Sequence, residues 1–200
     1  MKKYRHYGAE KYDPTKFKAI MNRRNFTKPY GGLWASEVQA ESSWKDWCEG
    51  ESFALDTLDK HFDFILREDA RVLRFEDSWQ AKLFKKDCPV FLRHENPFET
   101  AMILDFELLA KHYDAVEINA GSNADLYQLF YSWDCDSILI LNQDIIIPLQ
   151  EHEMDKVMDI WVDYVRGLED FDHMTQEDVL RGYIKCLENK IRELSKGGNS

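Results

Sequence analysis

The stretch Trp133–Leu141 reads WDCDSILIL, and the expected fold follows from it. Its second half, Ser137–Leu141, is a continuous apolar run of strand length, which is typical of a buried β-strand. Asp134 and Asp136 stand immediately before this run. Because side chains at positions i and i+2 of an extended chain point to the same side, we expect the two carboxyl groups to lie together at the head of the strand.

On either side of this strand in the sequence, short apolar or aromatic runs bounded by turn residues predict further strands. These are expected at residues 3–8, 33–36, 62–66, 72–75, 115–118 and 145–147. Helical spacing and capping residues predict helices at 14–23, after Ser42 or Ser43, from Ser78, and at 99–112, 125–131, 152–166 and 176–195. The strands lack the continuity and regular helical alternation of a doubly wound parallel sheet, so the sequence predicts an α+β fold with a helical tail.

Length and charge restrict the function classes. The 200 residues suit one domain or two small ones, and 37 acidic against 26 basic residues give a net charge of −11. An acidic body repels polyanions, which excludes broad electrostatic binding to nucleic acid or to an anionic membrane. A small nucleotide in a locally basic cleft is still compatible, because residues 1–30 hold nine basic residues against two acidic ones.

The chain has no apolar stretch long enough to cross a membrane, and its basic N-terminus lacks the apolar core of a signal peptide. Four cysteines stand far apart with no C-x-x-C pair. We therefore expect free thiols, a cytoplasmic protein and no metal site.

Two N-terminal stretches combine residue types that could bind a ligand. Tyr4–Ala9 (YRHYGA) places Arg5 and His6 on an early strand, with Gly8 at its end where backbone can approach a ligand. Gly31–Ser36 (GGLWAS) offers a sharp turn, a flat indole at Trp34 and a hydroxyl at Ser36. The structural alternatives are a solvated edge strand and a hairpin with a core tryptophan.

Acidic residues before the apolar strand complete the pattern. Held together, the two carboxyl groups of Asp134 and Asp136 could hydrogen-bond sugar hydroxyls or stabilise a cation. The structural alternative is a pair of acidic turn residues that cap a buried strand.

The chain carries, in order, a basic strand, a Gly-aromatic-Ser strand, and an acid-x-acid motif before an apolar strand. This order of motifs resembles that of the ADP-ribosyltransferase family. The resemblance covers about residues 3–148. It implies a split, mostly antiparallel sheet core with flanking helices over residues 1–150. Residues 151–200 would then form a C-terminal helical extension packed on the same domain.

Two subclasses of the family fit, and the motifs do not choose between them. The toxin-like subclass has an Arg on its first strand, a Ser on its second and an E-x-E motif, and the similar residues here are Arg5, Ser36, Asp134 and Asp136. The poly-ADP-ribosyl-polymerase-like subclass has a His followed by Gly, a G-x-Y-F-A run and one Glu, and the similar residues are His6, Gly8 and Gly32–Ala35. Both subclasses use glutamate where this chain has aspartate, which is shorter by one methylene.

The resemblance implies a mono-ADP-ribosyltransferase that uses NAD as co-substrate and modifies a protein or nucleic acid acceptor. Asp136 would hydrogen-bond the ribose 2′-OH and stabilise the positive charge that grows on the sugar as nicotinamide leaves. Asp134 would orient or deprotonate the acceptor, and Glu117 is the fallback acid. A toxin, a defence factor and a phage-derived modifier are the settings we consider for such an enzyme.

The binding residues follow from the same resemblance. Trp34 would stack on nicotinamide, and Ser36 would orient the acid. Arg5 or His6, with Gly8 beside them, would hold phosphate or ribose oxygens.

Two alternatives stand beside the transferase. The first is a non-catalytic nucleotide-binding or protein-interaction domain on the same fold, which the Asp-for-Glu departure favours. The second is an RNA 2′-phosphotransferase-like enzyme, although such an activity calls for a more basic surface. Acidic residues concentrated at 151–178 indicate either a solvated face or a surface for a basic protein partner or inhibitor.

Overall fold

A computed structural model describes residues 2–24, 26–93, 101–121 and 123–149. The chain divides into two compact units, residues 1–149 and 150–200. The second unit lies outside the described residues, and with it the helices expected at 152–166 and 176–195, their packing, and the acidic surface at 151–178.

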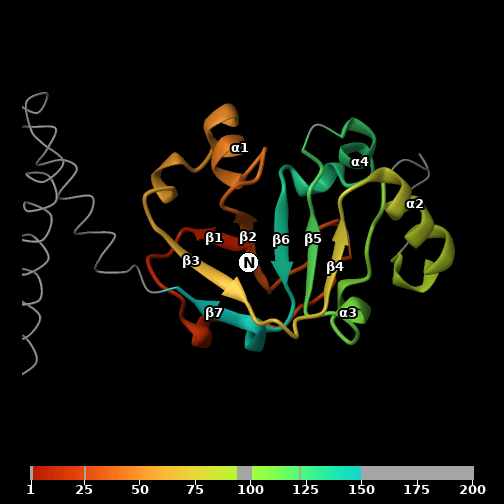
Figure 1. Cartoon of the computed structure of the whole chain (residues 1–200), viewed down its shortest axis with the longest axis horizontal. Helices are drawn as coiled ribbons and strands as arrows, with labels where there is room; N and C mark the ends of the chain where they lie inside the picture. Colours follow the sequence, from red (N-terminus) through yellow and green to blue (C-terminus); the bar gives the residue numbers. More distant parts are fainter. Residues whose placement is uncertain (1, 25, 94–100, 122, 150–200) are drawn as a thin grey trace, which may run out of the picture. The chain divides into compact units, whose positions relative to one another are not determined.

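One seven-stranded mixed sheet organises residues 1–149, in the order β4-β5-β6-β2-β1-β3-β7 (Figure 1). Its strands are β1 (Lys3–Tyr7), β2 (Leu33–Glu37), β3 (His61–Leu66), β4 (Val72–Phe75), β5 (Ala115–Ile118), β6 (Ser137–Ile140) and β7 (Ile146–Pro148). Among the neighbouring pairs in the described part of the chain, β4 and β5 are parallel and the others antiparallel. The predicted α+β class is therefore confirmed, as a mixed sheet with flanking helices.

Four α-helices flank the sheet in the described residues, each begun by a polar capping side chain. They are α1 (Trp44–Glu51), α2 (Ser78–Asp87), α3 (Phe106–Leu109) and α4 (Ala124–Leu129). Short 3₁₀ turns lie at Pro14–Lys16, Leu55–Thr57, Pro89–Phe91, Tyr131–Trp133 and Gln143–Ile145. The start of α1 is fixed by a capping box, in which Ser43 and Asp46 satisfy each other's backbone N–H groups.

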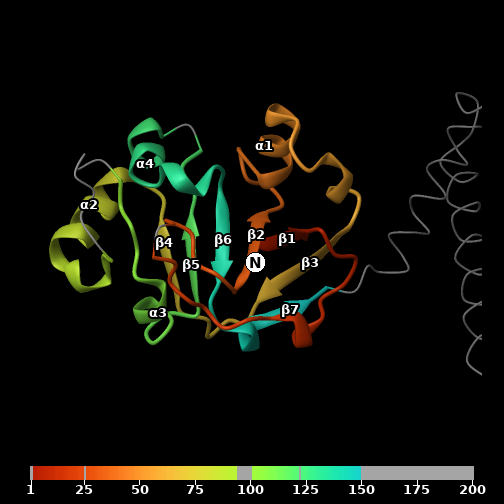
Figure 2. The same ribbon diagram turned by 180° about the vertical axis from the view of Figure 1, so that it is seen from behind.

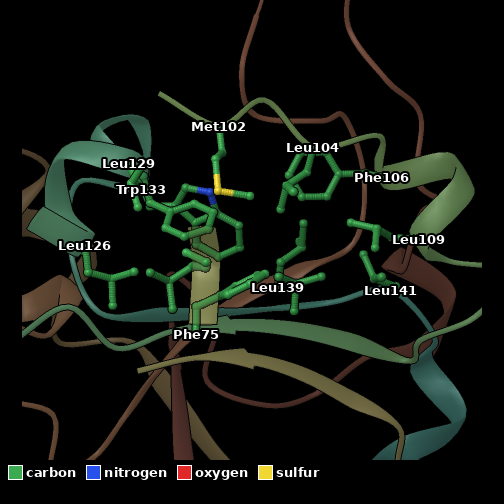
Figure 3. Packing of buried hydrophobic residues seen from close by; sticks show 14 residues of the cluster. Phe75, Met102, Leu104, Phe106, Leu109, Leu126, Leu129, Trp133, Leu139 and Leu141 are labelled. Carbon is green, nitrogen blue, oxygen red and sulfur yellow. The ribbon is translucent and has the colours of Figure 1, made fainter. Parts of the chain in front are cut away.

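Two apolar clusters lie on opposite faces of the sheet. The larger joins Phe75 and Leu139 from the strands to Met102, Leu104 and neighbouring side chains under α2, α3 and α4 (Figure 3). The smaller, on the other face, joins alternate residues of β1, β3 and β6, including Tyr4, Phe64 and Ile138. Strict alternation along β3, buried at every second residue, is the pattern expected of a half-covered strand.

Two helix predictions are wrong over most of their length. Of 14–23, only Pro14–Lys16 is helical; the chain then extends, and Met21 pairs with Tyr30 by a β-bridge. This segment runs along the sheet towards α3 (Figure 2), where the backbone N–H of Asn22 donates to Glu107. Tertiary hydrogen bonds have therefore replaced the helical ones that apolar spacing alone indicated.

Of the helix expected at 99–112, residues 99–100 lie outside the described part and only Phe106–Leu109 is α-helical. Met102, Ile103 and Leu104 are buried in an extended segment whose backbone bonds Leu129 and Arg93. A buried extended segment and a buried helix can have the same apolar composition. The apolar residues alone therefore do not indicate which of the two conformations forms here.

Asp114 ties the ends of β4, β5 and β6 together. Its carboxylate accepts hydrogen bonds from the backbone and guanidinium of Arg71, at 3.0 and 3.1 Å, and from Asn142 at 3.2 Å. Its carbonyl accepts from Leu141 and Asn142. The Arg71 hydrogen bonds lower the pKa of Asp114 to about 2, against the opposing effect of burial.

We predict that Asp114→Asn lowers the free energy of unfolding at pH 7 by about 1–2 kcal/mol, because charge-assisted hydrogen bonds are lost. A carboxylate with a depressed folded-state pKa stabilises above its unfolded pKa of 3.8, and this contribution is lost as pH falls towards 2. Urea unfolding of both proteins between pH 7 and pH 3 checks this. The difference in the free energy of unfolding between the two proteins should become smaller below pH 4. A difference that does not change with pH contradicts the stabilising role given to the Asp114 carboxylate.

Candidate functional site

A cavity of about 270 Å³ opens between β1, β2, the head of β6 and the start of α1. Aromatic and basic side chains dominate its lining. We call it the Trp34 cavity; its lining residues are Arg5, His6, Tyr7, Lys28, Trp34, Ala35, Ser36, Trp44, Trp133, Cys135 and Ser137.

Strand register explains why these residues meet. Arg5 on β1 lies directly opposite Ser36 on β2, and residues that face each other in an antiparallel pair share one side of the sheet. Alternation then adds Tyr7 and Trp34 to the same side. The pairing of Ala35 with Ile138 brings the head of β6 beside them, so Ser137 joins the lining.

Aromatic rings form the apolar part of the lining. The rings of Trp34 and Trp133 meet edge to face, with centroids 4.8 Å apart. Trp44 stacks on Trp47 along helix α1, with ring centroids 5.1 Å apart. The ammonium of Lys28 lies 5.5 Å from the centroid of Trp34, within the range of a cation–π interaction.

The two fixed cations of the lining each hold an acidic partner. Arg5 donates from Nε and Nη2 to the two carboxylate oxygens of Asp63, at 2.7 and 2.9 Å. Lys28 pairs with Asp134, and the two side chains are 34% and 32% exposed. Neither Asp63 nor Asp134 is among the lining residues, so the described wall of the cavity carries cations and no carboxylate.

Ser36 joins three elements behind the cavity. Its hydroxyl is buried, accepts a hydrogen bond from the backbone N–H of Trp44 at 2.9 Å, and donates to the backbone carbonyl of Asp136 at 2.9 Å. This single group therefore fixes the start of α1 and the head of β6 to β2.

His6 is held in its neutral form. Its Nδ1 lies 2.7 Å from the backbone carbonyl of Trp34, so Nδ1 carries the proton and donates it. Burial lowers the pKa of His6 below 6.5, and the hydrogen bond to the carbonyl opposes this only in part. At neutral pH the other ring nitrogen is therefore an acceptor.

Cys135 is not an activated nucleophile. Burial raises the pKa of its thiol to about 12, despite contact with the hydroxyl groups of Ser36 and Ser137. A thiol in this state stays protonated at neutral pH. Cys48, Cys88 and Cys135 are all free.

Asp136 is not among the residues that line the Trp34 cavity. Its carboxylate accepts a hydrogen bond from the backbone N–H of Gly121 at 2.9 Å. With Asp134 it borders a second, small hollow of about 20 Å³, which shares Trp133 and Cys135 with the Trp34 cavity. Asp134 has a positive φ of 66° and is followed by a strand that begins only at Ser137, so the alternation we assumed for the two carboxyl groups does not apply.

Of the other residues chosen from the sequence, Arg5, His6, Trp34 and Ser36 line the Trp34 cavity and Gly8 does not. Gly8 has a φ of +97°, and its N–H donates to the carbonyl of Lys60. Its place in the fold is the turn at the end of β1.

Glu117 lies on the opposite face of the sheet. It is 1% exposed and accepts hydrogen bonds from Tyr4, Lys2 and Arg74, with the Arg74 bond at 2.7 Å. Tyr4 precedes Arg5 on β1, so its side chain points away from the cavity. Glu117 therefore organises that face and does not reach the Trp34 cavity.

Sequence reasoning missed several lining residues. Tyr7 and Ser137 could have been found by extending the alternation of their strands by one step. Lys28, Trp44 and Trp133 come from a loop, a helix and a 3₁₀ turn, for which no local pattern indicates the direction of the side chain.

Comparison with known proteins adds no relative: no family model, curated protein or solved structure matches the chain. Within the described ranges, no group of three His, Cys, Asp or Glu residues could hold a metal ion. No helix in those ranges combines the length and apolar character needed to cross a membrane.

We predict that His6 titrates below pH 6.5, because burial penalises the imidazolium form. NMR titration of the imidazole resonances measures the midpoint directly. A midpoint above 6.5 would show that an acidic group faces the ring and would overturn the cavity electrostatics given above.

Proposed function

We propose that the Trp34 cavity binds the nicotinamide–ribose end of NAD⁺ and that the chain is a nucleotide-binding protein. The observation that carries the proposal is the convergence of Arg5, His6, Trp34 and Ser36, from two strands, on a single aromatic and basic cavity. The resemblance to ADP-ribosyltransferases implies the same four residues for that ligand.

The chemistry of the lining suits this end of NAD⁺. Nicotinamide in NAD⁺ is a flat ring, and the face of Trp34 or Trp133 can stack on such a ring. His6 borders the cavity, where its Nδ1–H is bonded to the backbone carbonyl of Trp34 and fixes the position of that residue. Arg5 and Lys28 provide charge for the phosphate that follows the ribose.

The volume of the cavity suits one end of NAD⁺ better than the whole molecule. Ligand pockets typically measure roughly 300–1,000 Å³, and this cavity lies just below that range at about 270 Å³. A ring with its sugar matches such a volume better than a whole dinucleotide does. The diphosphate would then lie beside the cations Arg5 and Lys28 of the lining.

ADP-ribosyl transfer is the second candidate function, and one contact favours it. The reaction needs a carboxylate near the ribose as the bond to nicotinamide breaks and C1′ joins the acceptor. Asp134 pairs with Lys28, which lines the Trp34 cavity, whereas Asp136 is turned to Gly121. Asp134 is therefore the better candidate acid of the two.

A third candidate follows from the cations in the lining. An RNA 2′-phosphotransferase-like activity would use Arg5 and Lys28 to hold a phosphate and needs no carboxylate in the cavity wall. The wall described above fits that requirement, while the net charge of −11 opposes broad RNA binding.

We predict that NAD⁺ raises the melting temperature and that Lys28→Glu weakens NAD⁺ binding at least tenfold, because the change places a negative charge beside the phosphate. Ligand at 100 times its Kd stabilises the folded state by about 2.7 kcal/mol, which a thermal-shift assay detects readily.

Lys111→Glu is the matched control: the same charge reversal at an exposed residue outside the cavity lining. It should leave the affinity within about twofold. Absence of any shift with millimolar NAD⁺, or equal losses in the two variants measured by calorimetry, would refute the nucleotide-binding proposal.

For the transfer reaction, we predict that Asp134→Asn lowers nicotinamide release from NAD⁺ at least tenfold while Asp136→Asn retains most of it. The reason is that only the first variant removes the carboxylate paired with Lys28, a residue of the cavity lining. Chromatographic assay of free nicotinamide checks this. Release equal to the uncatalysed background in all three proteins eliminates transfer and leaves binding as the function.

A further inference from the structure

A second hollow adjoins the Trp34 cavity on the same side of the sheet. It has a volume of about 550 Å³ and shares two residues, Arg5 and Tyr7, with the cavity. We call it the Lys45 groove; its remaining lining residues are Lys45, Glu49, Leu55, Leu58, Asp59 and His61. Arg5 and Tyr7 therefore form the boundary at which the two hollows meet.

We infer that the Lys45 groove is a second subsite, which takes the second nucleoside of a dinucleotide whose phosphates lie over Arg5 and Tyr7. This inference rests on the proposed function and adds to it the place where the second nucleoside of NAD⁺ binds.

The shared residues suit the linking phosphates. Arg5 donates from Nε and Nη2 to Asp63, and its guanidinium also interacts with the Tyr7 side chain, so the two shared residues form one polar group. Tyr7 adds a phenol on the same face of β1. A guanidinium held rigid by a carboxylate behind it is a preorganised donor for an anionic linker.

The groove has the mixed lining that a nucleoside needs. Leu55 and Leu58 give an apolar wall for a base, with Leu55 49% exposed. Glu49 and Asp59 are carboxylates that can accept hydrogen bonds from ribose hydroxyl groups, the contact acidic residues make in many dinucleotide sites. Lys45, with its weak 3.8 Å contact to Glu49, adds a cation at the rim.

His61 adds an aromatic ring to the lining of the groove. The ring packs against that of Tyr7, with centroids 5.9 Å apart. Together the two rings extend the surface on which a base can pack.

The test compares NAD⁺ with nicotinamide mononucleotide, which lacks the second nucleoside, by calorimetry on the full chain. The unmodified protein should bind NAD⁺ at least tenfold more tightly than the mononucleotide. Lys45→Glu and Leu55→Ser should reduce the NAD⁺ affinity to that of the mononucleotide and change the mononucleotide affinity by less than twofold. Both residues are about half exposed, so the fold should tolerate the substitutions.

Lys82→Glu is the matched control, since Lys82 is an equally exposed helical lysine with a comparable 3.9 Å contact, to Asp125, outside both hollows. It should change neither affinity. Equal affinity for NAD⁺ and the mononucleotide, or variants that weaken both ligands alike, overturns the second subsite and leaves the proposed function standing. Failure of both ligands to bind overturns the proposed function itself.

Discussion

The candidate site depends on the buried hydroxyl of Ser36. A backbone N–H at the start of α1 and a backbone carbonyl before β6 would both be left unpaired without it, and each would lose a hydrogen bond in a poorly hydrated place. Because the hydroxyl both accepts and donates, it fixes two elements far apart in the chain to one point on β2. The Trp34 cavity is the space left in front of this junction, so its shape follows from the same two bonds.

The strands were largely predictable from the sequence, and the reason is period-two burial. Residues of β3 alternate between buried and half-buried, and β6 is buried throughout, which are the two patterns that strands show. The helix predicted at 99–112 was wrong because Asp105 caps a single turn and the apolar residues before it are buried without being helical. The apolar composition of this segment indicates only that it is buried. Its conformation is determined by hydrogen-bond partners that are distant in the sequence.

The site was predictable where it lies on paired strands and not elsewhere. Arg5 and Ser36 belong to neighbouring strands, and the register of these strands places the two residues opposite each other. Two residues predicted separately from their chemistry therefore lie together in the structure. Asp136 was expected beside them, yet it precedes the first residue of β6, and the positive φ of Asp134 changes the direction of the chain there. Alternation holds only inside a strand, so a two-residue spacing before its start does not determine which hollow a carboxylate faces.

The positions of the charged side chains explain how a chain with a negative net charge can bind an anionic ligand. The net charge of −11 sets the long-range field, which salt screens beyond about 8–10 Å, whereas binding depends on the groups in contact with the ligand. In the Trp34 cavity those groups are Arg5 and Lys28, while their partners Asp63 and Asp134 stand outside the lining. Each carboxylate holds its cation in place without presenting a negative charge at the cavity wall. The arrangement favours a small phosphate-bearing ligand that enters the cavity over a long polyanion that must approach the whole acidic surface.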